Sequence, residues 1–346
     1  MTSPLSDPLI FQPIFRRYLW GGRRLATMLG KSLGPGNDYA ESWEVVDHHQ
    51  DQSVVMEGPL AGMTLHELVC YQAYDLFGKH AEKGHAEKGQ LAKHEVFPLL
   101  MKFLDANRTL SVQVHPTDEQ AALLTPPDLG KTEAWVVLAA EPGSQIYAGL
   151  ECEVTREQFR RAMEEGNCAS CLHAIQPDPG DCFYLPAGTV HAIGAGLVIA
   201  EIQQASDTTF RLFDWNRVGA DGKSRPLHIE QGLATIDFTR GPVKPQRPRS
   251  TEQTGRQRLV KCDYFVLDRC LFDEPFSVGG DNRFHLLAVL EGTIDLAGID
   301  MSLSAGHTLL LPAAAGARKL VPLADPAIGT QEGRGKQAVV LDIYLP

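Results

Sequence analysis

The sequence has no long apolar run and no excess of basic residues. No stretch approaches the roughly 18–20 apolar residues that a membrane span requires, so we expect no membrane partner. The formal net charge is −11 over 346 residues, and the chain lacks the basic field that attracts nucleic acid. It is 43% hydrophobic and 22% charged, a balance typical of a globular protein with a sizeable core.

The sequence also lacks the features of an exported, disulfide-bonded protein. Its first twenty residues do not show a basic start, an apolar centre and a small-residue cleavage site in that order. The seven cysteines are odd in number and scattered, which disfavours a disulfide framework. The close pair Cys168 and Cys171 has no second pair at zinc-finger spacing, so we interpret both as structural thiols. We therefore expect a cytoplasmic protein.

Helical patterns are few and lie in the first half of the chain. Residues 63–78 carry apolar residues at helical spacing, and residues 155–166 begin with Thr155 as an N-cap and end at a glycine. Many short strands at regular spacing predict an all-β sandwich or barrel. The strand-like runs, separated by Gly, Pro and Asp turns, include residues 132–140, 181–187, 196–204, 283–298 and 307–314.

Two segments of the chain repeat one pattern. PGDCFYLPAGTVHAI (179–193) resembles AGHTLLLPAAAGARK (305–319), since each has a glycine, strand residues and then Leu-Pro-Ala. Aligning the preceding strands sets Glu133 opposite His285, whereas His191 has an alanine as its counterpart. We infer a duplicated sandwich unit in which the second copy has lost any metal that the first one holds.

A segment rich in proline, arginine and polar residues, 241–257, separates the two copies and is typical of a linker. We therefore predict a catalytic domain over residues 1–240, with helical additions. A second, degenerate sandwich domain is predicted over residues 258–346.

The stretch LSVQVHP, residues 110–116, alternates apolar and polar residues. Alternation with period two places Ser111, Gln113 and His115 on one face of a strand. That face carries a hydroxyl, an amide and an imidazole, which point either to solvent or into a cavity.

Further donors stand at other strand ends, where a sandwich can point them inward. Glu133 heads one strand, and His191 follows the turn LPAGTV. With His115 and the amide oxygen of Gln113 they make a mixed nitrogen and oxygen set, which suits Zn²⁺ or another divalent ion such as Mn²⁺, Fe²⁺ or Co²⁺. The alternative is a set of hydrogen-bonded strand histidines and a solvated glutamate, and spacing alone leaves both open.

At these residues the sequence resembles the type I mannose-6-phosphate isomerases, zinc enzymes of the cupin superfamily. The resemblance implies a mainly β fold of two cupin-like jelly-roll β-sandwich units, in the compact form of the short bacterial members. It covers nearly the whole chain through ordered blocks, which are LWGG (19–22), ESWE (41–44), FPLLMKFLDANRTLSVQVHP (97–116), GKTEAWVVL (130–138), LPAGTVHAIGAG (185–196) and IAEIQQASDTTFRLFDWNR (199–217).

The resemblance also implies roles for single residues. Ser111 and Lys131 match residues that bind the substrate phosphate, and a hydroxyl and an ammonium are suitable donors to a phosphate dianion. Arg211 matches the active-site arginine. The implied ligands of one Zn²⁺ per chain are Gln113, His115, Glu133 and His191.

The implied reaction interconverts mannose 6-phosphate and fructose 6-phosphate by moving a proton between C2 and C1 through an enediol(ate). Arg211 is expected to stabilise the developing oxyanion, and phosphate binding to position the reacting carbons. Glu201 and Asp207, ten and four residues before Arg211, are the candidate bases. Lys131 is an alternative base, and ordinary turn chemistry is the alternative role for Asp207.

Two other function classes stay open on the sequence. The first is a cupin oxygenase that holds Fe²⁺, although Lys131 and Ser111 are not needed by an apolar substrate. The second is a non-catalytic sugar-phosphate binder, although an intact ligand set and Arg211 favour catalysis. We expect a sugar-phosphate substrate and a monomer or small homo-oligomer.

Overall fold

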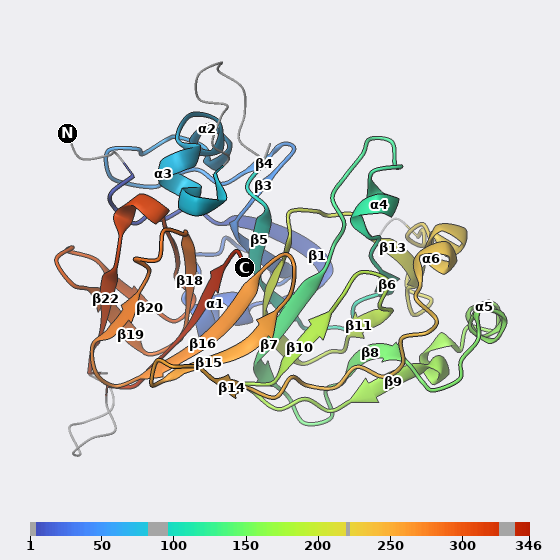
Figure 1. The fold of residues 1–346 in the computed structure, drawn as a ribbon. Coiled ribbons are helices and arrows are strands. Elements are labelled where there is room, and N and C mark those ends of the chain that lie inside the picture. Colours follow the sequence, from blue (N-terminus) through green and yellow to red (C-terminus); the bar gives the residue numbers. More distant parts are fainter. Residues whose placement is uncertain (1–4, 82–95, 219–221, 325–335) are drawn as a thin grey trace.

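The computed structural model describes residues 5–81, 96–218, 222–324 and 336–346, and it is mainly β, as predicted (Figure 1). All pairs within its sheets are antiparallel. The first large sheet has six strands in the order β1 (Ile14–Gly22), β2 (Tyr39–Val45), β5 (Leu99–Ala106), β12 (Leu197–Gln204), β7 (Glu133–Ala140) and β10 (Cys182–Leu185). A five-stranded sheet faces it, in the order β13 (Phe210–Phe213), β6 (Val112–Val114), β11 (His191–Ile193), β8 (Ile146–Leu150) and β9 (Leu172–Ile175).

The C-terminal part of the chain repeats this arrangement. Its six-stranded sheet has the order β14 (Arg249–Ser250), β15 (Arg256–Lys261), β16 (Val266–Phe272), β23 (Ala338–Tyr344), β18 (His285–Glu291) and β21 (Thr308–Leu311). The facing sheet has the order β17 (Phe276–Val278), β22 (Arg318–Pro322), β19 (Thr293–Leu296) and β20 (Ser302–Ser304). A short ribbon pairs β3 (Asp47–His48) with β4 (Asp51–Gln52).

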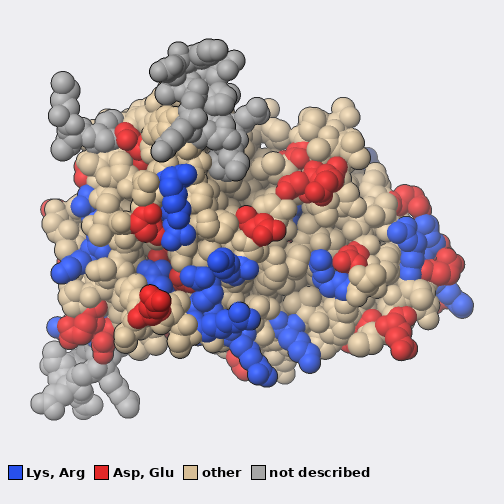
Figure 2. All heavy atoms as spheres, in the orientation of Figure 1, with Lys and Arg blue, Asp and Glu red and all other residues tan. Residues whose placement is uncertain are grey.

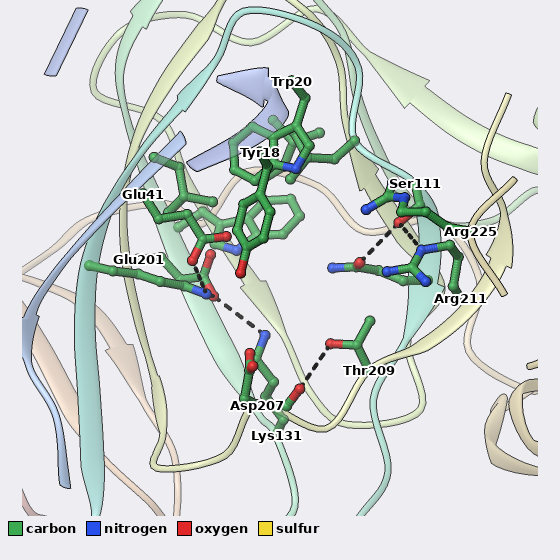
Figure 3. A pocket seen from close by; sticks show the side chains of 16 residues that line it. Tyr18, Trp20, Glu41, Ser111, Lys131, Glu201, Asp207, Thr209, Arg211 and Arg225 are labelled. Atoms are coloured by element: carbon green, nitrogen blue, oxygen red, sulfur yellow. Dashed lines mark hydrogen bonds and ion pairs between the residues drawn. The ribbon is translucent and has the colours of Figure 1, made fainter. Parts of the chain in front are cut away.

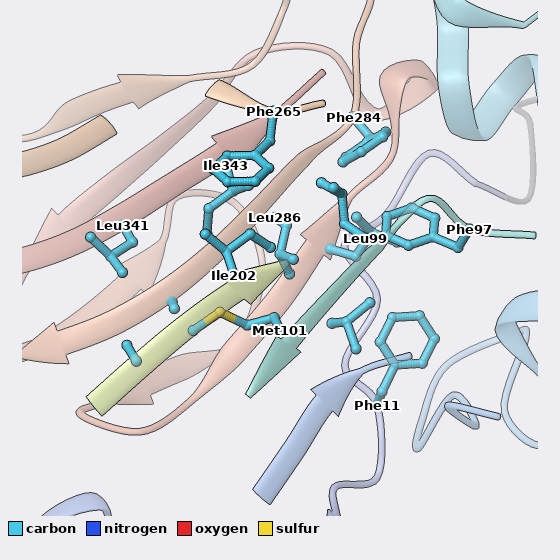
Figure 4. Close-up of a cluster of buried hydrophobic side chains, with 14 of the residues drawn as sticks. Phe11, Phe97, Leu99, Met101, Ile202, Phe265, Phe284, Leu286, Leu341 and Ile343 are labelled. Carbon is cyan, nitrogen blue, oxygen red and sulfur yellow. The ribbon is translucent and has the colours of Figure 1, made fainter. Parts of the chain in front are cut away.

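The two six-stranded sheets pack face to face and share one hydrophobic core (Figure 4). Alternate residues of β5, such as Leu99 and Met101, meet Leu286 and Ile343 of the second large sheet in this cluster. The inner strands of the first large sheet are therefore buried on both faces, because the five-stranded sheet covers their other side. This explains why β5 and β12 contain long apolar runs.

Helices are short and lie outside the sheets. The predicted helix over 63–78 is interrupted at Gln72 (φ −135°), which separates α2 from α3. The N-cap at Thr155 is confirmed, since its hydroxyl accepts from the backbone N–H of Gln158 in a capping box. The α-helices are α1 (Arg24–Leu29), α2 (Leu65–Tyr71), α3 (Ala73–Phe77), α4 (Asp118–Ala121), α5 (Arg156–Glu164) and α6 (Ile229–Thr235), and short 3₁₀ turns cover Gly78–His80, Cys168–Cys171 and Ala313–Ala315.

No helix in the described ranges is long and apolar enough to cross a membrane. Figure 2 shows acidic and basic side chains interspersed over one face, with basic ones gathered over β14 and β15. Lys244, Arg247, Arg249 and Lys261 line a cavity in that region.

The predicted linker, 241–257, lies against the first large sheet and its partner. The backbone N–H of Val243 donates to the carbonyl of Ala148 (3.0 Å) and that of Gln246 to the carbonyl of Cys182 (2.7 Å). The segment also supplies β14, the edge strand of the second large sheet. The division into domains at this segment stays a prediction.

The strand registers confirm the predicted alignment of Glu133 with His285. Both head the equivalent strand of their sheet, and each is paired with the leucine of a Leu-Pro step, Leu185 or Leu311. In the second copy His285 is buried and hydrogen-bonded through Nδ1 to Asp342 (2.7 Å). Burial alone lowers the pKa of His285, but Asp342 and other carboxylates outweigh it and raise the pKa to about 9.

We predict that the protein loses stability between pH 6.5 and 9 through His285. A folded pKa above the unfolded value of about 6.5 stabilises the protein fully below pH 6.5, and this contribution is lost as pH rises through 9. The free energy of unfolding, measured with urea, should fall by on the order of 2 kcal/mol over this range. His285→Gln should be less stable at pH 6 and show a flatter profile; an unchanged slope would contradict the assignment.

Candidate active site

The pleat of the first large sheet places three charged side chains on one face. Glu201 on β12 pairs with Lys102 on β5, and the adjacent strand β7 begins at Glu133. Their neighbours Met101, Ala134 and Ile202 belong to the core between the two large sheets. Because side chains alternate along a strand, the charged residues point to the opposite side, into the first sandwich.

A group that could hold a metal ion lies at this point. His115 follows β6, His191 begins β11, and Glu133 faces them from the other sheet. Each is about 1% exposed. Glu133 Oε2 lies 3.5 Å from Nε2 of His115, and Oε1 lies 3.3 Å from Nε2 of His191.

Backbone carbonyls fix both imidazoles. Nδ1 of His115 donates to the carbonyl of Thr208, and Nδ1 of His191 donates to the carbonyl of Thr189, each at 2.9 Å. In this tautomer Nε2 carries a lone pair that faces Glu133. Burial and the nearby Lys131 hold the pKa of His115 well below its usual range and lower that of His191 to about 3. Both rings are therefore neutral, as metal binding requires.

Glu133 has unused binding capacity. Within the described part of the chain its Oε1 is buried and accepts no hydrogen bond. Burial raises the pKa of this carboxyl, since the charged form loses its hydration. An unsatisfied carboxylate oxygen beside two neutral imidazole nitrogens fits a divalent cation, and the residues present are suited to hold one.

The Gln113 amide lies beside this group. Gln113 pairs with His191 across β6 and β11, and its amide nitrogen is 3.3 Å from Nε2 of His191. Ser111 Oγ donates to Oε1 of the same amide at 3.4 Å. The structure thus brings all four predicted ligand residues together, while their role as ligands stays a prediction.

Lys131 lies at the same group and not beside Ser111. Its ammonium is 3.0 Å from Nε2 of His115, donates to Glu133, and is 3.4 Å from Glu201. It is buried, at 3% exposure. The ammonium therefore lies between two carboxyl groups in the interior of the pocket and offsets part of their charge.

Ser111 and Arg211 form the other side of the pocket (Figure 3). Arg211 Nε donates to Ser111 Oγ at 3.3 Å, and Arg225 lines the pocket close by. Burial and the neighbouring Arg225 lower the pKa of Arg211, yet an arginine of this kind stays charged. Two guanidinium groups and a hydroxyl make a site for an anion with several oxygens.

The two candidate bases differ in their surroundings. Glu201 is buried and ion-paired at 3.4 Å with Lys102 as well as with Lys131. Burial alone raises the pKa of Glu201, but these two ammonium groups outweigh it and lower the pKa. Asp207 is exposed and lines the opening of the pocket.

Several residues of this pocket were not predicted as site residues from the sequence. Lys102 lies in the apolar run FPLLMKFLDA, where a lone lysine is itself a signal, since lysine is seldom buried without a partner. Glu41, in ESWE, is 3.7 Å from Lys102. Burial raises the pKa of Tyr18 to about 12. Tyr18, Trp20, Glu41, Lys102, Thr209 and Arg225 all line the pocket, which has a volume of about 280 Å³.

Comparison with known proteins places the chain in a family. A model of the catalytic domain of type I phosphomannose isomerases matches residues 9–131. The mannose-6-phosphate isomerase ManA of Bacillus subtilis is 36% identical over 83% of this chain and 86% of its own. The chain belongs to the type I phosphomannose isomerase family.

Further relatives agree with this placement. The mannose-6-phosphate isomerase of Streptococcus mutans is 35% identical over 89% of this chain and 93% of its own. The crystal structure of the mannose 6-phosphate isomerase from Bacillus subtilis covers 98% of this chain and 100% of its own, with 26% identity and a TM-score of 0.82. The family predicted from the motif blocks is thereby confirmed, as is the cupin-like fold.

We predict that Lys102→Met destabilises the protein by about 3 kcal/mol, because it leaves Glu201 short of a buried partner. Combining it with Glu201→Gln should recover part of this loss, since the uncompensated charge is removed. Urea unfolding of the metal-free protein measures both effects. Lys261→Met, at an exposed lysine, is the control and should stay within about 0.5 kcal/mol. A Lys102→Met variant as stable as the control would show that the pair is not required.

Proposed function

We propose that the protein is a metal-dependent mannose-6-phosphate isomerase that uses Zn²⁺. The observation that carries the proposal is one pocket with a buried His115, Glu133 and His191 group on one side and Arg211 with Ser111 on the other. The relatives named above are mannose-6-phosphate isomerases. A cytoplasmic location and a monomer or small homo-oligomer belong to the same proposal.

In this proposal His115, Glu133 and His191 hold the ion, with Gln113 as the fourth ligand. When bound, Zn²⁺ supplies a Lewis acid that polarises the oxygen atoms on the reacting carbons. An ion and the Lys131 ammonium cannot share the same lone pairs. Lys131 is therefore expected to turn to Glu201 or to substrate when the metal is present.

The phosphate end of the substrate lies at Ser111 and Arg211, with Arg225 beside them. The Arg211 guanidinium and the Ser111 hydroxyl can bind phosphate oxygens, and Arg225, whose Nε and Nη2 already donate to Asp214, adds positive charge beside them. Binding there holds the sugar along the pocket, so that C1 and C2 lie at the buried end near Lys131. Arg211 is also placed to stabilise negative charge on a substrate oxygen.

Proton transfer between C1 and C2 requires a carboxylate that can reach the substrate. We assign Asp207 as the base, because it lines the pocket and is exposed, whereas Glu201 is buried. Glu201 is paired with Lys102 and Lys131 and its lowered pKa makes it a weak base. Its role in this proposal is to hold those two ammonium groups in place.

The test of the function is isomerisation of mannose 6-phosphate by the purified protein, before and after chelation and with Zn²⁺ added back. Activity should disappear with the chelator and return with zinc, because the polarising ion leaves and rebinds. The metal content is measured in parallel. Full turnover by protein shown to be metal-free would refute the metal-dependent mechanism, and no turnover by metal-loaded protein would refute the activity.

His191→Ala localises the metal. Loss of one of three buried ligands should remove bound zinc and activity together while circular dichroism stays unchanged. His173→Ala is the matched control, because His173 pairs with Glu151 at the surface of the molecule. A His191→Ala protein that retains both zinc and turnover would place the metal elsewhere.

We predict that Asp207→Asn lowers kcat by about 10²–10⁴-fold with little change in KM, since a general base contributes about this much. The acidic limb of the pH profile of kcat should disappear in this variant. In Glu201→Gln the acidic limb should remain, even though kcat falls. If instead only Glu201→Gln removes the acidic limb, the assignment of the base is reversed.

A further inference from the structure

The segment 206–208 carries two groups of the proposed site, although it belongs to no strand. The carbonyl of Thr208 accepts the Nδ1 proton of His115 (2.9 Å), and Asp207 between its neighbours lines the pocket. The orientation of one proposed ligand and of the proposed base therefore depends on how this short irregular segment is held.

Asp128 holds the segment from outside the pocket. Its Oδ2 accepts from the hydroxyls of Ser206 (3.0 Å) and Thr208 (2.6 Å), the two residues that flank Asp207. Its Oδ1 accepts from the backbone N–H of Leu129 (2.8 Å) and lies 3.1 Å from Nε2 of His48. The carboxylate thus ties the loop before β7 to the segment between β12 and β13.

The carboxylate is anchored as an anion. Burial alone raises the pKa of Asp128, but the donors from His48, Thr208 and Leu129 outweigh it and lower the pKa. Its side chain is 10% exposed. A hydrogen bond to a carboxylate is stronger than one between neutral groups, so this anchor resists displacement of the segment.

The same carboxylate is one of a second group, with His48 and His49, whose ligand atoms lie within 4.8 Å of one another. A metal role does not suit it, because four donors already occupy its two oxygens. An ion there replaces the contact between His48 and Oδ1 and competes with the Leu129 amide for that oxygen. The geometry favours a positioning role.

We propose that Asp128 is a positioning residue that fixes the Thr208 carbonyl, and through it the tautomer and orientation of His115. The proposal rests on the function proposed above, since it assumes that His115 binds the metal. Groups that bond to the far nitrogen of a metal-binding histidine typically change metal affinity by 10–100-fold when removed. Here Asp128 acts one step further out, on the carbonyl that makes this bond.

The test is the affinity of the metal-free protein for Zn²⁺, measured by competition with a chromophoric chelator. Asp128→Ala should bind zinc about tenfold more weakly, because the Thr208 carbonyl is no longer fixed. Asp128→Asn should recover much of the affinity, since its amide can still hydrogen-bond both hydroxyls. Rescue by this conservative variant is not expected if the residue acts only through the overall charge of the loop.

Thr208→Val provides an independent variant. It keeps the carbonyl that accepts from His115 but removes the hydroxyl that donates to Asp128, so its affinity should fall in the same direction. With Asp128→Ala the effects should be less than additive, because both changes break one contact. If Asp128→Ala does not fold, Thr208→Val decides the question alone.

Asp105→Ala is the matched control. Asp105 is also a buried carboxylate, and it accepts from the backbone N–H (2.7 Å) and Nε (2.8 Å) of Arg24, away from the pocket. It should lower the melting temperature and leave zinc affinity unchanged. Equal losses of affinity in the control, or wild-type affinity in Asp128→Ala and Thr208→Val, would overturn the proposal. Zinc affinity is measured without substrate, so an absence of isomerase activity leaves this result intact.

Discussion

The structure depends on the burial of both faces of the first large sheet. A buried charge must be paired, because its hydration is lost. Five buried charged groups lie on the interior face of this sheet or just before its strand β7. They are Lys102, Lys131, Glu41, Glu133 and Glu201. Two cations face three carboxyl groups, and the surplus carboxyl, that of Glu133, has a raised pKa and lies next to two neutral imidazoles. This surplus favours a cation at the group, and a divalent ion then makes the pocket positive toward an anionic substrate.

The second copy of the sandwich shows what happens when the same positions are internally balanced. Its registers place Asp342 where Glu201 lies and Asp268 where Lys102 lies, so the charges change type while the positions stay buried. Asp342 is paired with both His285 (2.7 Å) and Arg256 (2.6 Å), and Arg256 stands at the position of Glu41. These ion pairs occupy both oxygens of the Asp342 carboxylate. In the described part of the first copy, by contrast, Glu133 Oε1 accepts no hydrogen bond. The duplication thus yields one open centre and one that is closed by its own side chains.

Local patterns allowed much of this to be predicted. The alternation in LSVQVHP gave the shared face of Ser111, Gln113 and His115, and the two Leu-Pro-Ala turns gave the duplication that sets Glu133 against His285. The contact between Lys131 and His115 could not be predicted from such patterns, because the distance between the two side chains depends on how the two sheets face each other. Asp128 shows the same limit. Nothing in its neighbourhood in the sequence signals Thr208, which lies 80 residues away.

The imidazoles of His115 and His191 are oriented in the same way, since each donates from Nδ1 to a backbone carbonyl in an irregular segment. His191 bonds to the carbonyl of Thr189, and Arg240 Nη1 donates to the Thr189 hydroxyl (2.9 Å) and to the carbonyl of Ala187 (2.9 Å) in that turn. An anion, Asp128, therefore anchors the turn that orients His115, and a cation anchors the turn that orients His191. Both anchors come from segments outside the strands that carry the histidines. A strand fixes where a side chain begins, but the rotation of an imidazole ring depends on what its far nitrogen meets. In this protein that contact is made by irregular turns, and charged residues distant in sequence make these turns rigid enough to serve the centre.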